Sequence, residues 1–171
     1  MLPKIKIVQG IDRTADLRSR LEMLTKRQVL VGVPQTKPSG GDNTSRRERT
    51  KANNAMLAYV HDNGSPLQGI PRREFLRPGI KGAQREIAEK QRQTARAALD
   101  EGGAERIEKG LVAVGLIAQR AVRKKITDGP FSPLKAGTLR ARRRRGRTGT
   151  RPLIDTGQLR NAINFAVRDK K

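Results

Sequence analysis

The sequence has no cysteine and a single histidine, and both shortages exclude classes of functional site. Without cysteine the chain cannot form a disulfide framework, a thiolate zinc site, an iron–sulfur cluster or a thiol nucleophile. His61 alone cannot supply a two-histidine metal site within one chain. We therefore expect neither a metal site nor a bound cofactor.

Aromatic residues are also scarce, at 2% of the chain, and tryptophan is absent. The four rings are Tyr59, Phe75, Phe131 and Phe165. Single-strand binders and sheet-type RNA modules stack bases on aromatic platforms. The chain has too few aromatic rings to favour those modes of nucleic-acid recognition. The remaining possibilities are contacts to nucleic-acid phosphates or to the acidic face of a protein.

Long apolar runs are missing as well. The longest, residues 111–118, contains a glycine and is far shorter than the roughly 20 residues that a membrane span needs. The first residues are basic but lack the apolar region and small-residue cleavage site of a secretory signal. These absences predict a soluble protein that is used without export and without a membrane partner.

Positive charge is the strongest feature that is present. Lys and Arg number 38 against 16 Asp and Glu, which gives a formal net charge of +22 over 171 residues. A compact body with this excess repels itself unless an acidic partner lies nearby. The length suits one domain with tails, and 35% hydrophobic residues allow only a lean core.

The first half of the chain predicts short elements joined by loops. We expect a strand over 5–11, a helix capped by Asp12 or Thr14, and an internal strand over 28–34 that is apolar on both faces. The polar residues 35–54 predict a long mobile loop. Beyond it we expect a helix over 54–64, a turn, and an extended piece over 72–78 held open by prolines.

The second half contains the strongest helix prediction. After a polar helix over 79–100 and a Gly-Gly break, apolar residues keep a 3.6-residue spacing over 20 positions, and the helix should stop at 128–130. The stripe consists of Ile107, Leu111, Val114, Ala118, Val122 and Ile126. Residues 164–168 alternate as a terminal strand would.

A run of cations without any acid follows, between Asp128 and Asp155. Arginines can contact phosphates in a bidentate manner, and such binding is steeply salt-dependent. The alternative is a solvated basic loop without a specific binding role, whose positive charge neutralises the charge of an acidic neighbouring protein. We interpret residues 135–151 as an unstructured basic arm whose candidate contact residues are Lys135, Arg140, Arg142, Arg143, Arg144, Arg145, Arg147 and Arg151.

Possible catalytic groups do not form a constellation. His61 and Asp62 are neighbours on a predicted helix and do not face one another, so they are not expected to act as an acid–base pair. Asp155, with Gln158 three residues on, fits the start of a helix as a capping box. The carboxylates are scattered or lie beside arginines, so the sequence predicts a protein that is not an enzyme.

Four segments, taken in order, resemble a known family. They are Val29–Pro34, Asn54–Gly64, Ile70–Pro78 and Pro152–Ile163, the last being the most specific. Together they look like the tailed-bacteriophage neck and tail-completion proteins, a group that includes the virion-morphogenesis and minor tail protein Z-like proteins. The resemblance covers roughly residues 28–168. The chain departs from the pattern at Asp62–Asn63, where an acidic–aromatic pair is common, and at Arg73, where a small residue or proline is frequent.

The resemblance implies an α+β fold in which a small antiparallel or mixed sheet packs against two main helices, with long basic loops or arms. It also implies a structural virion protein that forms a ring at the head–tail junction, as neck, tail-completion or tail-terminator protein. Its partners would be identical subunits, a hexamer first and a dodecamer second, together with a portal or head-completion protein and the tail tube protein. Double-stranded DNA would pass through the lumen, and assembly would take place in the bacterial cytoplasm.

Further candidate residues come with this interpretation. Arg72 and Arg73 join the basic arm as contacts to DNA or a partner. The expected inter-subunit or neck-docking residues are Tyr59, His61, Phe75, Leu76, Leu153, Ile154 and Leu159. The alternative function is a small basic protein that binds double-stranded nucleic acid and belongs to no virion ring.

Overall fold

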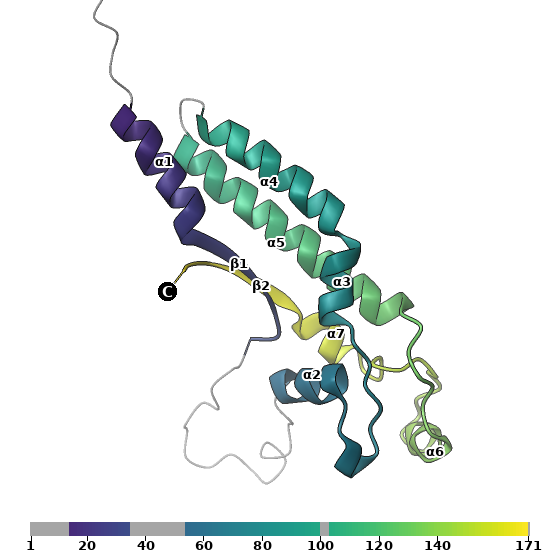
Figure 1. Cartoon of the computed structure of the whole chain (residues 1–171). Helices are drawn as coiled ribbons and strands as arrows, with labels where there is room; N and C mark the ends of the chain where they lie inside the picture. The colour runs from purple at the N-terminus through teal and green to yellow at the C-terminus, as the bar shows by residue number, and fades with distance from the viewer. Residues whose placement is uncertain (1–13, 35–53, 100–102, 171) are drawn as a thin grey trace, which may run out of the picture.

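The computed structural model describes residues 14–34, 54–99 and 103–170, and the expected strand over 5–11 and nearly all of the expected loop over 35–54 lie outside them. Along the described chain the elements alternate between helices and two strands (Figure 1). They are α1 (Thr14–Lys26), β1 (Arg27–Gly32), α2 (Asn54–Asn63), the 3-10 turn η1 (Pro66–Gln68), α3 (Leu76–Gly82), α4 (Gln84–Leu99), α5 (Gly103–Asp128), α6 (Ala136–Arg144), α7 (Gln158–Ala162) and β2 (Asn164–Asp169).

Helix α5 is the central element, and the sequence prediction for it is confirmed. All six residues of its apolar stripe are buried. Helix α4 runs beside it (Figure 1), with Thr94 packed so closely on Gly110 that a side chain there would collide with it. The molecule is thus an α+β protein with two main helices and a small sheet, as expected.

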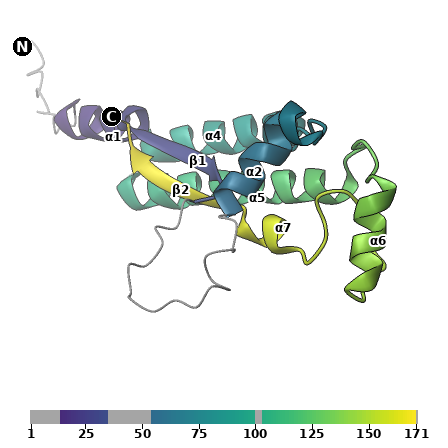
Figure 2. The same ribbon diagram turned by 90° about the horizontal axis from the view of Figure 1, so that it is seen from below.

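The sheet has two antiparallel strands, with Val29 paired to Val167 and Val31 to Phe165. Phe165 lies against Gly115, which places one face of the sheet on α5 (Figure 2). The terminal strand is confirmed. The expectation of an internal strand over 28–34 is wrong, because β1 pairs only with β2 among the described residues and Leu30 is 46% exposed on it.

Helix α3 begins inside the segment that the prolines were expected to hold extended. Only residues 72–75 are non-helical, and Pro78 is the third residue of α3. The first turn of a helix has N–H groups without intrahelical partners, so a proline there costs no hydrogen bond. The Asp62 carboxylate satisfies the backbone N–H groups of Phe75 and Leu76, at 2.9 and 3.1 Å. The single helix expected over 79–100 is instead divided at Ala83.

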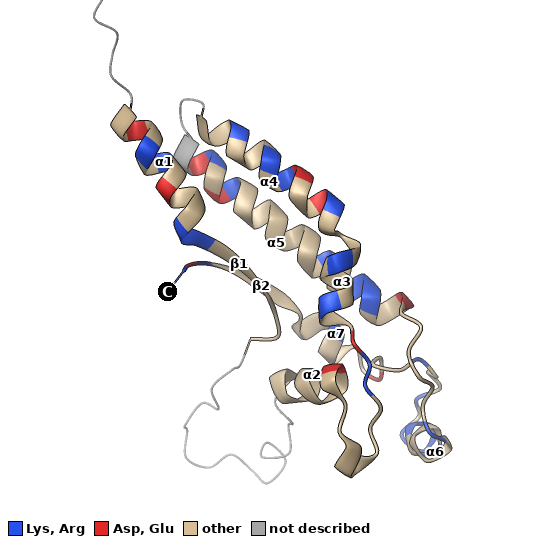
Figure 3. Cartoon of the chain, in the orientation of Figure 1, with Lys and Arg blue, Asp and Glu red and all other residues tan. Residues whose placement is uncertain are grey.

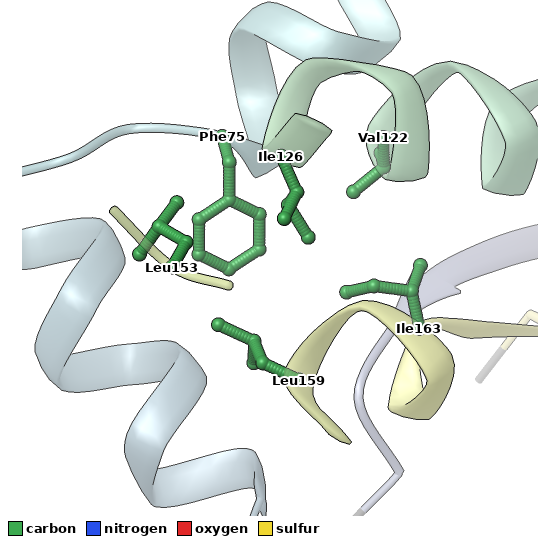
Figure 4. Close-up of a cluster of buried hydrophobic side chains, with 6 residues drawn as sticks. All are labelled: Phe75, Val122, Ile126, Leu153, Leu159 and Ile163. Carbon is green, nitrogen blue, oxygen red and sulfur yellow. The ribbon is translucent and has the colours of Figure 1, made fainter. Parts of the chain in front are cut away.

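Two apolar clusters hold these elements together. The larger one joins α5, α7 and the segments before α3 and α7 (Figure 4) through Phe75, Val122, Ile126, Leu153, Leu159 and Ile163. The smaller one, formed by Ala98, Ile107 and Leu111, receives Leu24 of α1 and Val29 of β1. Among the described helices, none is both long and apolar enough to cross a membrane.

Candidate functional site

The basic segment is folded, contrary to the expected unstructured arm. Residues 136–144 form α6, which stands apart at the end of α5 and runs across its direction (Figure 2). Alanine, leucine and arginine favour helix, and the cations Arg142, Arg143 and Arg144 lie in its last turn, where they complement the helix dipole. The segment is therefore an ordered basic element.

Arg142 is an internal strut of this element. Its side chain is 8% exposed, and its Nη1 donates hydrogen bonds to the carbonyls of Gly149 and Arg151, at 2.9 and 3.0 Å. Its Nε lies 3.3 Å from Asp155 Oδ1. These contacts close the loop that follows α6, so Arg142 is not free to meet a partner.

Asp155 is the shared counter-ion of the cluster. It pairs with Arg142, with Arg147, and with Arg145 at 3.9 Å. The expected helix cap is wrong: α7 starts after Gly157, and Gln158 donates its side-chain hydrogen bond to Asn54 at 2.8 Å. A carboxylate among three cations gains more from ion pairing than it would from capping a five-residue helix.

The remaining cations of the segment point to solvent. Arg140, Arg143 and Arg144 are exposed at i, i+3 and i+4 of α6, so they share one face, and they form no ion pair with any described residue. Lys135 and Arg151 are exposed at the two ends of the basic segment 135–151. Figure 3 shows this concentration of positive charge on α6. Its chemistry suits bidentate contact with carboxylates or phosphates.

The two arginines proposed before α3 have different environments. Arg72 is exposed and pairs with Glu74. Arg73 is 5% exposed and donates to the carbonyls of Ser132 and Pro133, at 3.1 and 3.3 Å. Arg73 therefore ties the α2–α3 segment to the chain before α6 and is not available to DNA or to a partner.

The expected docking residues also differ in their exposure to solvent. Phe75, Leu153 and Leu159 are buried in the chain's own core, so a partner cannot reach them. Leu76 and Ile154 pack against that core and are half-buried. Tyr59, by contrast, is 69% exposed on α2 and is available for contact.

His61 lies half-buried under the α2–α3 turn, and the geometry supports no acid–base pair. Its Nδ1 is buried without a hydrogen-bond partner among the described residues, while the neighbouring Asp62 carboxylate caps α3. Burial lowers the pKa of His61, and the positive charge of Arg73 lowers it further. The imidazole is thus held neutral within the fold.

We expect the stability of the protein to fall as the pH drops below 6.5. The unfolded chain binds the proton with the ordinary histidine pKa of 6.5, whereas the folded chain does so only at lower pH. The contribution of neutral His61 is therefore complete above 6.5 and is lost as the pH falls toward the lower folded value. Urea unfolding at pH 7.5 and 5.5 should show a larger loss in the wild type than in His61→Gln; an equal loss contradicts the assignment.

A second basic surface was missed by sequence reasoning. A cleft of about 670 Å³ lies between the C-terminal half of α5 and α7. Its lining residues are Leu116, Gln119, Arg120, Arg123, Lys124, Thr127, Arg160 and Asn161. The spacing of Arg120, Arg123 and Lys124, on the opposite face of α5 from its apolar stripe, was the available signal. The approach of Arg160 depends on tertiary packing and has no sequence signature.

No group of three or more His, Asp or Glu side chains that could hold a metal ion occurs in the described part of the chain. The candidate site consists of the exposed basic side chains of α6 and of the cleft between α5 and α7. Comparison with protein-family models, curated proteins and solved structures finds no match to this chain.

Proposed function

We propose that the chain is a structural protein of a tailed-phage virion, which assembles as a ring at the head–tail junction and joins portal or head-completion proteins to the tail tube around the DNA channel. The observation that carries this proposal is the amount of apolar and cationic surface that the single described subunit leaves uncovered. An assembly of neighbouring subunits and virion proteins would cover both kinds of surface.

Large exposed apolar side chains lie on α1, β1, α2, η1, α4 and α5, and three of the most exposed lie on α2 and η1. Met56 and Tyr59 are 65% and 69% exposed, and Leu67 is fully exposed. A two-stranded sheet is marginal by itself, and no further strand among the described residues pairs with its outer edges, where another strand could add. Burial of these groups against neighbours would add stability through binding to the folded form.

The cationic part is the exposed face of α6. Arg140, Arg143 and Arg144 are held on a helix that Arg142 bonds to the loop that follows it, so their positions are set before any partner arrives. Such a charged face sets the register of docking to an acidic surface. A heterologous contact between identical subunits closes into a ring when its rotation allows; six copies, matching a tail tube, are our first choice and twelve our second.

Removal of the α6 charges tests this role. In the phage genome that encodes the chain, replacement of Arg140, Arg143 and Arg144 by glutamine should give heads and tails that fail to join, as seen by electron microscopy of lysates. The matched control replaces Arg85, Arg92 and Arg96, exposed on α4, and should leave virion yield unchanged. A normal yield from the α6 variant, or absence of the chain from purified particles, contradicts the proposal.

The net charge of +22 also favours a second function, a free protein that binds duplex nucleic acid. The two functions differ in oligomeric state. A neck protein should form rings, or join them when mixed with virion parts, whereas the free binder should stay monomeric and be absent from particles. Mass photometry of the purified chain, combined with the composition of purified particles, separates them.

A further inference from the structure

The cleft between α5 and α7 has an unusual lining. Four of its eight lining residues are cationic, none is acidic, and three of the others carry a hydroxyl or amide group. A surface with this composition favours anions, because no carboxylate in its lining competes for the guanidinium and ammonium groups. The cleft is also separate from α6, so its charge is not part of the site already described.

The cations are held on rigid elements. Arg120, Arg123, Lys124 and Thr127 stand at i, i+3, i+4 and i+7 of α5, so they share one face of the helix. The opposite face of that helix is its buried apolar stripe. Helix α7 is fixed by the burial of Leu159 and the adjoining Ile163 in the core, which positions Arg160 and Asn161 across the cleft.

The chain's own acceptors do not use all the donors in the cleft. Arg123 donates from Nη2 to the Ile163 carbonyl at 2.9 Å and its Nε is buried, so it contributes positive charge to the cleft but no free Nε donor. Arg120 has only a long contact with Glu86, at 3.8 Å between two largely exposed side chains, and such pairs contribute little. Lys124 and Arg160 form no ion pair with a described residue.

We infer that this cleft binds the phosphate backbone of double-stranded DNA. A duplex carries one negative charge per about 1.7 Å of its axis, so cations one helical turn apart can each meet a phosphate. Arginine, lysine and asparagine, all present in the lining, are side chains that position proteins on phosphates. Gln119 and Thr127 already donate to the carbonyls of Ile163 and Arg123, at 2.8 and 3.0 Å. No aromatic ring lines the cleft, so single strands would find no stacking platform.

The inference deepens the proposed function, on which it rests for the source of the DNA. It divides the two basic surfaces by partner: α6 would contact protein, and the α5–α7 cleft would contact the genome. DNA binding is nevertheless a property of the purified chain, so it can be measured without a virion.

The test compares two double variants that remove the same charge. Lys124→Gln with Arg160→Gln alters the cleft, while Arg92→Gln with Arg96→Gln alters exposed cations of α4. Fluorescence anisotropy with a labelled duplex, repeated over a range of salt, gives affinity and salt slope. Each lost phosphate contact reduces the slope by about 0.9. The cleft variant should therefore lose about 1.8 of slope, equivalent to about thirtyfold weaker binding at 0.15 M salt, and the control less than about threefold.

Three results would overturn the inference. The first is equal binding by the two variants when circular dichroism shows both to be folded. The second is a cleft variant that binds duplex as tightly as the control does but no longer binds polyglutamate, a mimic of an acidic protein surface. That result would assign the cleft to an acidic protein. The third is displacement of duplex by inorganic phosphate at constant ionic strength, which would assign it to a small anion. A chain that binds duplex through the cleft yet is missing from virions would instead contradict the proposed neck function alone.

Discussion

Replacement of Arg142 by alanine should lower the free energy of unfolding by about 3 kcal/mol and release the following loop from α6. The substitution removes two charge-assisted hydrogen bonds, to the carbonyls of Gly149 and Arg151, at a nearly buried position. It also takes from Asp155 the least exposed of its three arginine partners. Loss of these hydrogen bonds, each made by a charged donor, accounts for most of the expected effect.

The neighbouring residue supplies the control. Arg143→Ala removes the same charge from the same helix, but Arg143 is exposed, and surface substitutions of this kind change stability by less than about 0.5 kcal/mol. Arg142→Lys keeps the charge without the planar fork, so it should restore only part of the loss. Urea unfolding and amide exchange of α6 measure both effects. Similar values for Arg142→Ala and Arg143→Ala would show that Arg142 is not the strut.

The contrast between Arg142 and Arg143 also marks the limit of the sequence analysis. In the sequence, residues 142–145 are four consecutive arginines with nothing to distinguish them. The fold separates them, because a helix turns by about 100° per residue, so one side chain faces the loop that follows α6 while the next faces solvent. The carbonyls of Gly149 and Arg151, together with Asp155, determine which arginine is buried.

Predictions that depend on local periodicity were correct. The apolar spacing of α5 and the alternation of β2 survive in the structure because burial on one face imposes that spacing. Features that depend on a distant partner were not predicted. Asp62 reaches across to cap α3, and Leu153 has a left-handed φ of +63° inside the core. Neither feature has a local pattern, because tertiary packing sets both.

The candidate site shows the same division. The charge of the basic segment was visible in the sequence. In the structure, however, Arg73 and Arg142 are buried, and each donates to two backbone carbonyls. The α5–α7 cleft was missed because its cations are spread over two helices and interleaved with apolar residues. In this protein, the cations that are neighbours in the sequence are therefore not the same residues as the cations that are neighbours in space.

A second large effect is expected where the sheet docks on α5. An alanine Cβ at Gly115 would lie 2.6 Å from Cγ and 2.7 Å from Cε2 of Phe165, and closer still to Cδ2. Alanine is the better helix former by about 1 kcal/mol, but overpacking of this severity costs more. We therefore expect Gly115→Ala to destabilise the protein by about 2 kcal/mol, with the loss of sheet docking visible as faster amide exchange in β2.

Substitution of Gly137 is the matched control, for which we expect a change in stability of the opposite sign. It also lies in a helix, but a Cβ at this position in α6 meets no atom within 4 Å, so Gly137→Ala should stabilise the protein by up to about 1 kcal/mol. The Phe165→Ala background isolates the collision: with the ring removed, Gly115→Ala should lose its penalty and take the sign of Gly137→Ala. Thermal unfolding of the four variants measures the coupling between Gly115 and Phe165. If Gly115→Ala remains equally destabilising without the ring, the close approach of β2 to α5 is not its cause.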